Sequence, residues 1–258
     1  MDGEFKGKVA VVTGGSRGIG RAIAAALAGR GAQTVLVAMS QDNLAAAAKA
    51  IAPKGAPAPV IVAGDLRTLA ACETVHARVR EQFGRCDILV NNAGATRAGA
   101  FLDLADDLWV DGFALKYFAC ARLSRLFWPM LKEAKGHVVN IIGGAARTPD
   151  PNFLIGGSVN AAMANFSKGL SQLGKREGVN VNVIHPGMTE TDRVTQLFAQ
   201  RATASGKTPE EVRAQALKDG MGQPGDVAAL AVFLCSNAAR HIQGTAIAVD
   251  GGATPGFY

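Results

Sequence analysis

Short apolar runs alternate along this chain with longer stretches in which apolar residues recur at helical spacing. The short runs are rich in β-branched residues, which favour strands. They occupy residues 9–13, 34–38, 60–63, 87–90, 137–142, 180–184 and 246–249. The helical stretches lie at residues 19–29, 43–51, 69–83, 106–131, 161–176 and 225–236. Alternation at this spacing predicts βαβ units, and hence a parallel sheet covered by helices on both faces.

The strand candidates also indicate how the sheet is buried and how many domains the chain has. They are short and almost wholly apolar, as strands that are buried on both faces should be. No linker separates two halves, and the proline-rich piece at 53–59 only connects a helix to a strand. We therefore predict one α/β domain over residues 1–258, a Rossmann-like, doubly wound sheet of seven parallel strands.

The region at about 188–222 departs from the alternation, because a polar helical stretch follows the sixth strand there. Within it, Thr208-Pro209-Glu210-Glu211 combines a helix N-cap, a proline in the first turn and a glutamate at the reciprocal capping position. An insertion at the carboxyl edge of a parallel sheet lies where ligands bind in such folds. The region is therefore either a substrate lid or an ordinary surface pair of helices.

Composition and charge limit the kinds of partner. The hydrophobic fraction of 48% is ample for a core and excludes a disordered chain. No run reaches the about 18 apolar residues of a membrane span, and residues 1–6 lack the apolar core of a signal peptide. The net charge is +6, but basic residues are spread singly and aromatic residues make up only 6%. This pattern argues against nucleic acid or a membrane as partner and favours anionic small molecules.

Cysteine usage bears on the compartment and on metal binding. The four cysteines, Cys72, Cys86, Cys120 and Cys235, show neither a CxxC pair nor the spacing of metal ligands. We expect reduced thiols in a cytoplasmic protein, and no metal site.

A glycine-rich loop joins the first predicted strand to the first predicted helix. After Thr13 the chain reads Gly14-Gly15-Ser16-Arg17-Gly18-Ile19-Gly20. Glycines at such a point permit a tight turn and a close approach of the backbone to a diphosphate. The N-terminus of the following helix adds N–H donors and a positive dipole end. Because it lies between a strand and a helix, the loop predicts a dinucleotide site.

Four further motifs follow this loop along the chain. They are Asp65-Leu66, Asn91-Asn92-Ala93-Gly94, Pro186-Gly187-Met188-Thr189 and Asp250-Gly251-Gly252. With all five motifs in this order and spacing, the chain resembles the short-chain dehydrogenase/reductase family along essentially its whole length. The resemblance implies an oxidoreductase that uses a nicotinamide cofactor and, as in many relatives, a homotetramer or homodimer.

The resemblance also implies which residues bind the cofactor. Asp65 and Leu66 would contact the adenine, and the Asn91–Gly94 motif would line the adenosine side. Residues 186–189 would hold the nicotinamide carboxamide. The implied set is Thr13, Gly14, Ser16, Arg17, Gly18, Ile19, Gly20, Ala38, Met39, Ser40, Asp65, Leu66, Asn92, Ala93, Gly94, Pro186, Gly187 and Thr189.

The end of the second strand bears on the choice between the two nicotinamide cofactors. An acidic side chain there would bind the ribose 2′-hydroxyl and repel a 2′-phosphate, but no carboxylate occurs before Asp42. Arg17 is a basic residue in the glycine loop, as in relatives that prefer NADP, and Ser40 could add a hydroxyl donor. Met39 stands where those relatives often have an arginine. NADP(H) is therefore favoured over NAD(H); the alternative for Arg17 is a solvated loop arginine.

The usual catalytic residues of the family are absent. Relatives reduce a carbonyl with a Tyr-x-x-x-Lys pair, assisted by a serine and an asparagine; the lysine lowers the pKa of the phenol that exchanges the proton. Here the only tyrosines are Tyr117 and Tyr258, and neither begins such a pair. By local context the four positions are occupied by Gly156 (tyrosine), Asn160 (lysine), Gly143 (serine) and Lys116 (asparagine).

Two hypotheses follow for Lys116. Since asparagine and lysine have exchanged positions, an Asn160–Lys116 pair would hold the nicotinamide ribose with the partners swapped. Alternatively, Lys116 is a surface lysine of its helix. The candidates for a proton donor are Ser158, His185 and Lys116, and His185 has the alternative of a purely structural role.

The two glycines carry an expectation about the shape of the site. Gly143 and Gly156 should open space where serine and tyrosine side chains would intrude, so that the site takes a bulkier ligand or one that is bound differently. Phe153, Leu154 and Ile155 would add an apolar wall.

Three functions are compatible with these features. The first is an NAD(P)(H)-dependent oxidoreductase that acts on a carbonyl or hydroxyl group of a small molecule with a non-standard active site. The second is a catalytically silent NADP(H)-binding protein, either a sensor or a partner subunit. The third, a lyase or hydrolase on the same fold, is disfavoured by the near-complete cofactor motifs.

Overall fold

The computed structural model of the chain describes residues 3–51, 57–192, 194–195, 198, 202, 206–218 and 220–254. Its centre is one sheet of seven strands in the order β3-β2-β1-β4-β5-β6-β7, and every pairing is parallel. The strands are β1 (Val9–Thr13), β2 (Gln33–Ala38), β3 (Val60–Ala63), β4 (Ile88–Asn91), β5 (His137–Ile141), β6 (Asn180–Pro186) and β7 (Ala246–Val249). The predicted doubly wound parallel sheet is confirmed.

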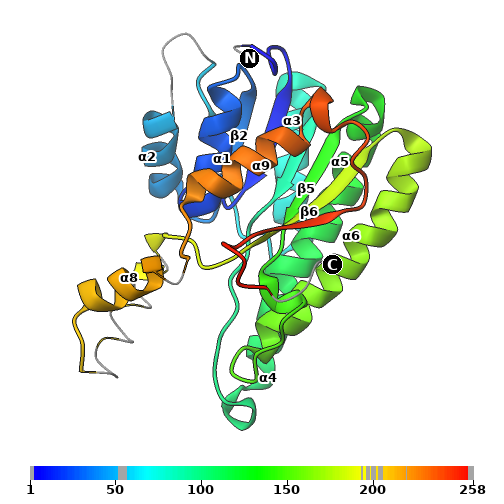
Figure 1. Cartoon of the computed structure of the whole chain (residues 1–258). Coiled ribbons are helices and arrows are strands. Elements are labelled where there is room, and N and C mark those ends of the chain that lie inside the picture. Colours follow the sequence, from blue (N-terminus) through cyan, green and yellow to red (C-terminus); the bar gives the residue numbers. More distant parts are fainter. Residues whose placement is uncertain are drawn as a thin grey trace.

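Helices cover both faces of this sheet (Figure 1). One face carries α1 (Gly18–Ala28), α2 (Gln41–Ile51) and α9 (Pro224–Leu234), and the other carries α3 (Leu69–Phe83), α5 (Ala119–Ala134) and α6 (Leu154–Glu177). The side chains of β1 point alternately toward the two faces of the sheet. Ala10 and Val12 belong to the first core, and Val9 and Val11 to the second. This two-sided burial explains why the strands are apolar throughout.

The predicted helix at 106–131 is interrupted. It consists of α4 (Asp106–Gly112), a π-helical segment at Phe113–Phe118 and α5. At the junction the Ala119 N–H donates to the Ala114 carbonyl, five residues earlier rather than four. Such a segment shifts every following residue around the helix axis, and π turns are frequent at functional sites.

Helix α6 begins at Leu154, earlier than the predicted start at 161. Two glycines in its first turns lower the helical propensity of that stretch. Packing compensates, because Ile155, Val159 and Met163 form one buried face. The early start matters for the site, since it places residues 156–160 on a helix.

The predicted region at about 188–222 is described in part; residues 193, 196–197, 199–201, 203–205 and 219 lie outside the described residues. Its capping box is confirmed at the start of α8 (Pro209–Lys218): the Thr208 N–H donates to Glu211 Oε2 at 2.8 Å, and the Glu211 N–H to Thr208 Oγ1 at 3.2 Å. Helix α8 stands away from the sheet (Figure 1). Along the described chain, no helix has both the length and the apolar character that a bilayer span needs.

Candidate cofactor and active site

A cavity of about 590 Å³ lies at the carboxyl edge of the sheet. It runs along the ends of β1, β2, β3, β4, β5 and β6, where ligands bind in open α/β sheets. Every residue that the sequence predicts to bind the cofactor lines this cavity, with the exception of Thr13, Gly20 and Asn91, whose buried side chain donates to Asn140 instead. Its volume lies within the range of about 300–1,000 Å³ that is typical of ligand sites.

Thr13 and Gly20 do not line the cavity, but they fix the position of the backbone segments that do. Thr13 is buried, and its Oγ1 accepts the N–H groups of Asn92 and Ala93, each at 2.9 Å, which fixes the end of β4 against β1. A Cβ on Gly20 would lie 2.3 Å from the Gly14 carbonyl oxygen. Glycine at this position therefore allows α1 to pack directly against the glycine loop.

The glycine loop is built to receive an anion. Gly14 and Gly18 have φ angles of +64° and +54°, which residues with a side chain rarely adopt. A Cβ on Gly14 would also lie 2.7 Å from Asn92 Nδ2. Helix α1 begins directly after this loop, and its N-cap residue, Arg17, makes no side-chain cap to the first turn. The first N–H groups of α1 are thus left for a ligand such as a diphosphate.

The end of β2 presents no acidic side chain to the cavity. Met39 lines the cavity and is 66% exposed, so this position offers no charge to a ligand. Ser40 Oγ accepts the Asn43 N–H at 3.2 Å, which ties this hydroxyl to the start of α2. Asn43 itself lines the cavity, a contact that the sequence motifs did not indicate. Arg17 is exposed and lines the same cavity.

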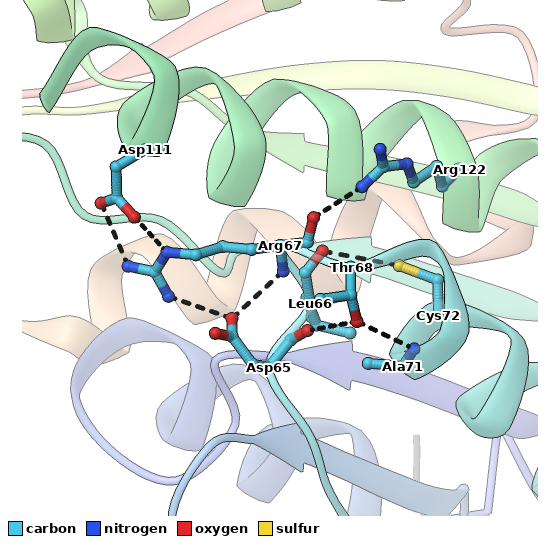
Figure 2. Close-up of polar contacts among 8 residues, drawn as sticks. All are labelled: Asp65, Leu66, Arg67, Thr68, Ala71, Cys72, Asp111 and Arg122. Carbon is cyan, nitrogen blue, oxygen red and sulfur yellow. Dashed lines mark hydrogen bonds and ion pairs between the residues drawn. The ribbon is translucent and has the colours of Figure 1, made fainter. Parts of the chain in front are cut away.

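A polar cluster surrounds Asp65 at the end of β3 (Figure 2). Asp65 Oδ1 accepts the main-chain N–H of Arg67 at 3.1 Å and its Nη1 at 3.0 Å. The guanidinium of Arg67 also forms a two-point contact with Asp111 of α4, and this contact holds the pKa of Asp111 below its ordinary value. Both Asp65 and Arg67 line the cavity. Sequence analysis missed Arg67, because its partner lies 44 residues further along the chain.

Lys116 and Asn160 lie in direct contact. Lys116 Nζ donates to Asn160 Oδ1 at 2.5 Å, and Asn160 is only 2% exposed. The stem of Lys116 passes over Gly94, where a Cβ would lie 2.9 Å from Lys116 Cδ. Lys116 lines the cavity beside Gly143 and Gly187. The alternative that Lys116 is a surface lysine is therefore wrong, whereas its role toward a cofactor stays a prediction.

The space expected at the two glycines is already filled. A Cβ on Gly156 would lie 2.1 Å from two ring carbons of Phe153, and a Cβ on Gly143 would lie 2.9 Å from Asn160 Nδ2. The expectation that these glycines open room for a bulkier ligand is wrong. The Phe153 ring and the Asn160 amide occupy this space.

The other two candidates for a proton donor do not line the cavity. Ser158 is exposed and does not line the cavity. It precedes Asn160 by two positions on α6, which places it about 200° around the helix. His185 is 2% exposed, and its Nδ1 lies 2.7 Å from the Ile142 carbonyl oxygen. Burial lowers its pKa, so the ring is neutral at pH 7 and fits the structural role that the sequence left open.

The comparisons with known proteins agree with this geometry. A family model described as "short chain dehydrogenase" matches residues 8–202. The chain belongs to the short-chain dehydrogenase family. Among the described residues, no group of three or more histidine, cysteine, aspartate or glutamate side chains is arranged to hold a metal ion.

Three relatives within the family illustrate the range of similarity. The chain is 32% identical to 3-oxoacyl-(acyl-carrier-protein) reductase FabG of Escherichia coli (strain K12) over 252 residues, which cover 96% of this chain and 98% of the relative. It is 32% identical to 2,3-dihydro-2,3-dihydroxybenzoate dehydrogenase of Bacillus subtilis (strain 168), with 98% of each protein covered. L-sorbose reductase from Gluconobacter frateurii, solved with NADPH and L-sorbose, matches with a TM-score of 0.94 at 32% identity, and 100% of each chain is covered.

Proposed function

We propose that this protein is an NADP(H)-dependent oxidoreductase that acts on a carbonyl or hydroxyl group of a small molecule, with Lys116 near the reacting oxygen. The observation that carries the proposal is the contact between Lys116 and Asn160 at the wall of the cavity. A cation at this point replaces the phenol that relatives use. Family membership supports the reaction type, and the substrate is proposed by chemical class alone.

The cavity residues fit NADP(H) along its length. The cradle of Gly14 and Gly18 at the start of α1 suits the diphosphate. Arg17 and Ser40 would hold the 2′-phosphate, and no carboxylate from β2 opposes it. Residues 186–189 and Lys116 would lie along the nicotinamide riboside. When bound, the cofactor supplies the hydride; the protein supplies orientation and electrostatics.

Lys116 has two tasks in this proposal. Its ammonium would contact the nicotinamide ribose and fix the orientation of the ring against the substrate. Its positive charge would also stabilise the negative charge that develops on the carbonyl oxygen as hydride arrives, and Nζ could then supply the proton. Asn160 is buried and accepts from Nζ, so it holds the ammonium in place.

A second candidate function is a catalytically silent NADP(H)-binding protein. The observation that favours it is the loss of both hydroxyl groups that relatives use: position 143 is glycine, and Phe153 fills the space beside Gly156. The loss of one general acid typically lowers a rate by about 10²–10⁴-fold, which does not remove activity altogether. Turnover therefore separates the two functions.

The deciding experiment is Lys116→Met, with Lys132→Met as a matched control. Lys132 lies on α5, is 56% exposed and contacts Glu177 at 3.7 Å, away from the cavity. We expect Lys116→Met to weaken NADPH binding about 10–100-fold in titration calorimetry, because a hydrogen bond from a charged group is lost. It should also abolish any oxidation of NADPH found in a screen of carbonyl compounds. Parent-like binding and turnover would refute the role of Lys116; weakened binding without any substrate would favour the silent protein.

We also propose that the protein is a homotetramer or homodimer and is cytoplasmic. A groove between α5 and α6 supports assembly through these helices; it is lined among others by Phe118, Trp128, Phe166 and Leu170. Light scattering of the purified protein tests the oligomeric state.

We further propose that the region at 188–222 serves as a substrate lid. Met188 and Thr189 line the cavity, and the neighbouring Glu190 binds Arg213 of α8.

A further inference from the structure

Arg67 contacts the chain on both sides of the π-helical segment (Figure 2). Before the segment, its guanidinium binds both carboxylate oxygens of Asp111, with the Nη2–Oδ2 contact at 3.2 Å. After the segment, Arg122 Nη1 donates to the main-chain carbonyl of Arg67 at 2.8 Å. One residue of the β3–α3 connection therefore fixes the last turn of α4 relative to the first turn of α5.

The same residue is tied to the cavity. Its main-chain N–H and its Nη1 both donate to Asp65 Oδ1, so Arg67 cannot shift without moving Asp65. The side chain of Arg67 is 26% exposed, which leaves its contacts partly shielded from water. A planar guanidinium that makes two parallel bonds to one carboxylate fixes direction as well as distance. Asp111 is ionised at neutral pH, as an ordinary aspartate is, and the hydrogen bond from Arg67 lowers its pKa further.

The position of Lys116 depends on the π-helical register. An α-helix advances by about 100° per residue, and a π turn accommodates one residue more than the corresponding α turn. If the segment Phe113–Phe118 reverted to α-helix, the helix after it would turn by about that angle relative to the helix before it, and Lys116, which lies within the segment, would no longer be directed at Asn160. The π-helical conformation of this segment must therefore be maintained if Lys116 is to face the cavity.

We propose that Arg67 is a positioning residue that maintains this register: by holding Asp111 and Arg122 at a fixed separation, it keeps Lys116 directed at Asn160 and the cavity. This inference rests on the proposed function only for the importance of Lys116. The arrangement in which Arg67 holds Asp111 and Arg122, called the clamp below, does not depend on the proposed function. Asp111 is the informative partner, because it does not line the cavity and its loss removes no direct contact with a cofactor.

The test compares Asp111→Asn, Arg67→Met and Arg67→Lys with the parent protein. Asparagine at 111 has the shape of aspartate and should leave the fold intact. Arg30→Met is the matched control, because Arg30 pairs with Glu4 at 3.5 Å and does not line the cavity. In the protein without ligand, amide hydrogen exchange over residues 113–118 should accelerate about tenfold in Asp111→Asn and Arg67→Met. Arg67→Lys, which loses the two-point contact, should exchange at an intermediate rate, and Arg30→Met like the parent.

Binding of NADPH supplies the second measurement. Asp111→Asn should weaken NADPH about tenfold, although Asp111 is outside the cavity, and it should add no further loss in the Lys116→Met background. Unchanged exchange over 113–118 in both Asp111→Asn and Arg67→Met overturns the inference, as do losses that multiply in the double variant. If Lys116→Met alone leaves NADPH affinity unchanged, the proposed function fails, and the exchange measurement still decides whether the clamp exists.

Discussion

The ring of Phe153 occupies the space that a side chain at Gly156 would need: two of its carbons lie 2.1 Å from the point where a Cβ would sit. A side chain at position 156 therefore requires that the Phe153 ring move. Gly156→Tyr alone cannot place a phenol at this point while the ring keeps its position.

This contact predicts that Gly156→Ala destabilises the protein. The new methyl group must displace the ring, at a cost of about 1–3 kcal/mol in the free energy of unfolding. The control is Gly157→Ala, whose Cβ would meet its nearest neighbour, the Ala145 carbonyl oxygen, at an ordinary 3.5 Å. In a helix that change should be neutral or stabilise by up to about 1 kcal/mol. Urea unfolding of both variants measures the difference, and equal effects would contradict the prediction.

The same prediction extends to a double variant. In a Phe153→Ala background the ring is gone, so the penalty of Gly156→Ala should largely disappear. A penalty of the same size in both backgrounds would show that the ring is not its cause.

Gly143→Ser should disturb the Lys116–Asn160 contact. A Cβ at position 143 would lie 2.9 Å from Asn160 Nδ2, so the amide that accepts from Lys116 must shift. We expect NADPH affinity to fall about tenfold in titration calorimetry, the effect of about one hydrogen bond. Gly144→Ser is the neighbouring control, because its Cβ would meet only Thr254 Oγ1, at 3.8 Å. Similar affinities for the two serine variants would show that Asn160 tolerates the change.

Arg17→Ala should weaken NADPH about 10–100-fold and NADH much less. The reason is that the guanidinium would make a charge-assisted bond to the 2′-phosphate, which NADH lacks. Arg21→Ala serves as the control: Arg21 is exposed on α1 and does not line the cavity. Equal losses for the two cofactors would overturn the assignment of Arg17 to the phosphate.

His137 should make stability depend on pH. It is buried in β5, and burial, aided by the positive charge of Lys8, lowers its pKa to about 4. In the unfolded chain its pKa is about 6.5, so between these values the unfolded state binds more protons and stability falls as pH falls. Above a pH of about 6.5 the buried neutral histidine does not lower the free energy of unfolding. Between that pH and about 4, the free energy of unfolding falls progressively, by roughly 2–3 kcal/mol.

The measurement is urea unfolding of the parent and of His137→Gln from neutral pH downward. The difference between the two proteins should shrink over this range, because glutamine does not titrate. His241→Gln is the control, since His241 is exposed. If parent and His137→Gln lose stability in parallel, the histidine is not the source of the pH dependence.

The fold was predictable because burial on both faces leaves a strong local signal. Strands such as β1 must be apolar throughout, and the glycine loop must follow one of them directly. The contact between Lys116 and Asn160 was also predictable as one hypothesis, from the exchange of two residue types.

Other parts of the site depend on contacts that no local pattern encodes. The pairing of Arg67 with Asp111 spans 44 residues, and the π-helical segment has no distinct hydrophobic period. Ser158 was misjudged for a different reason. Position 158 lay outside the helix predicted to start at 161, so the direction of its side chain could not be predicted. Because α6 starts at Leu154, Ser158 is helical and its side chain points away from that of Asn160.

The position of β1 in the sheet has a consequence for the folding pathway. Its partners are β2, which follows closely, and β4, which is distant: the Val9 N–H binds Asp87, 78 residues later. Closing so long a loop costs entropy before any contact is gained, and such topologies fold slowly. Until β4 arrives, β1 offers an unpaired apolar edge to the solvent. Refolding should therefore compete with association between chains, and its yield should fall as protein concentration rises.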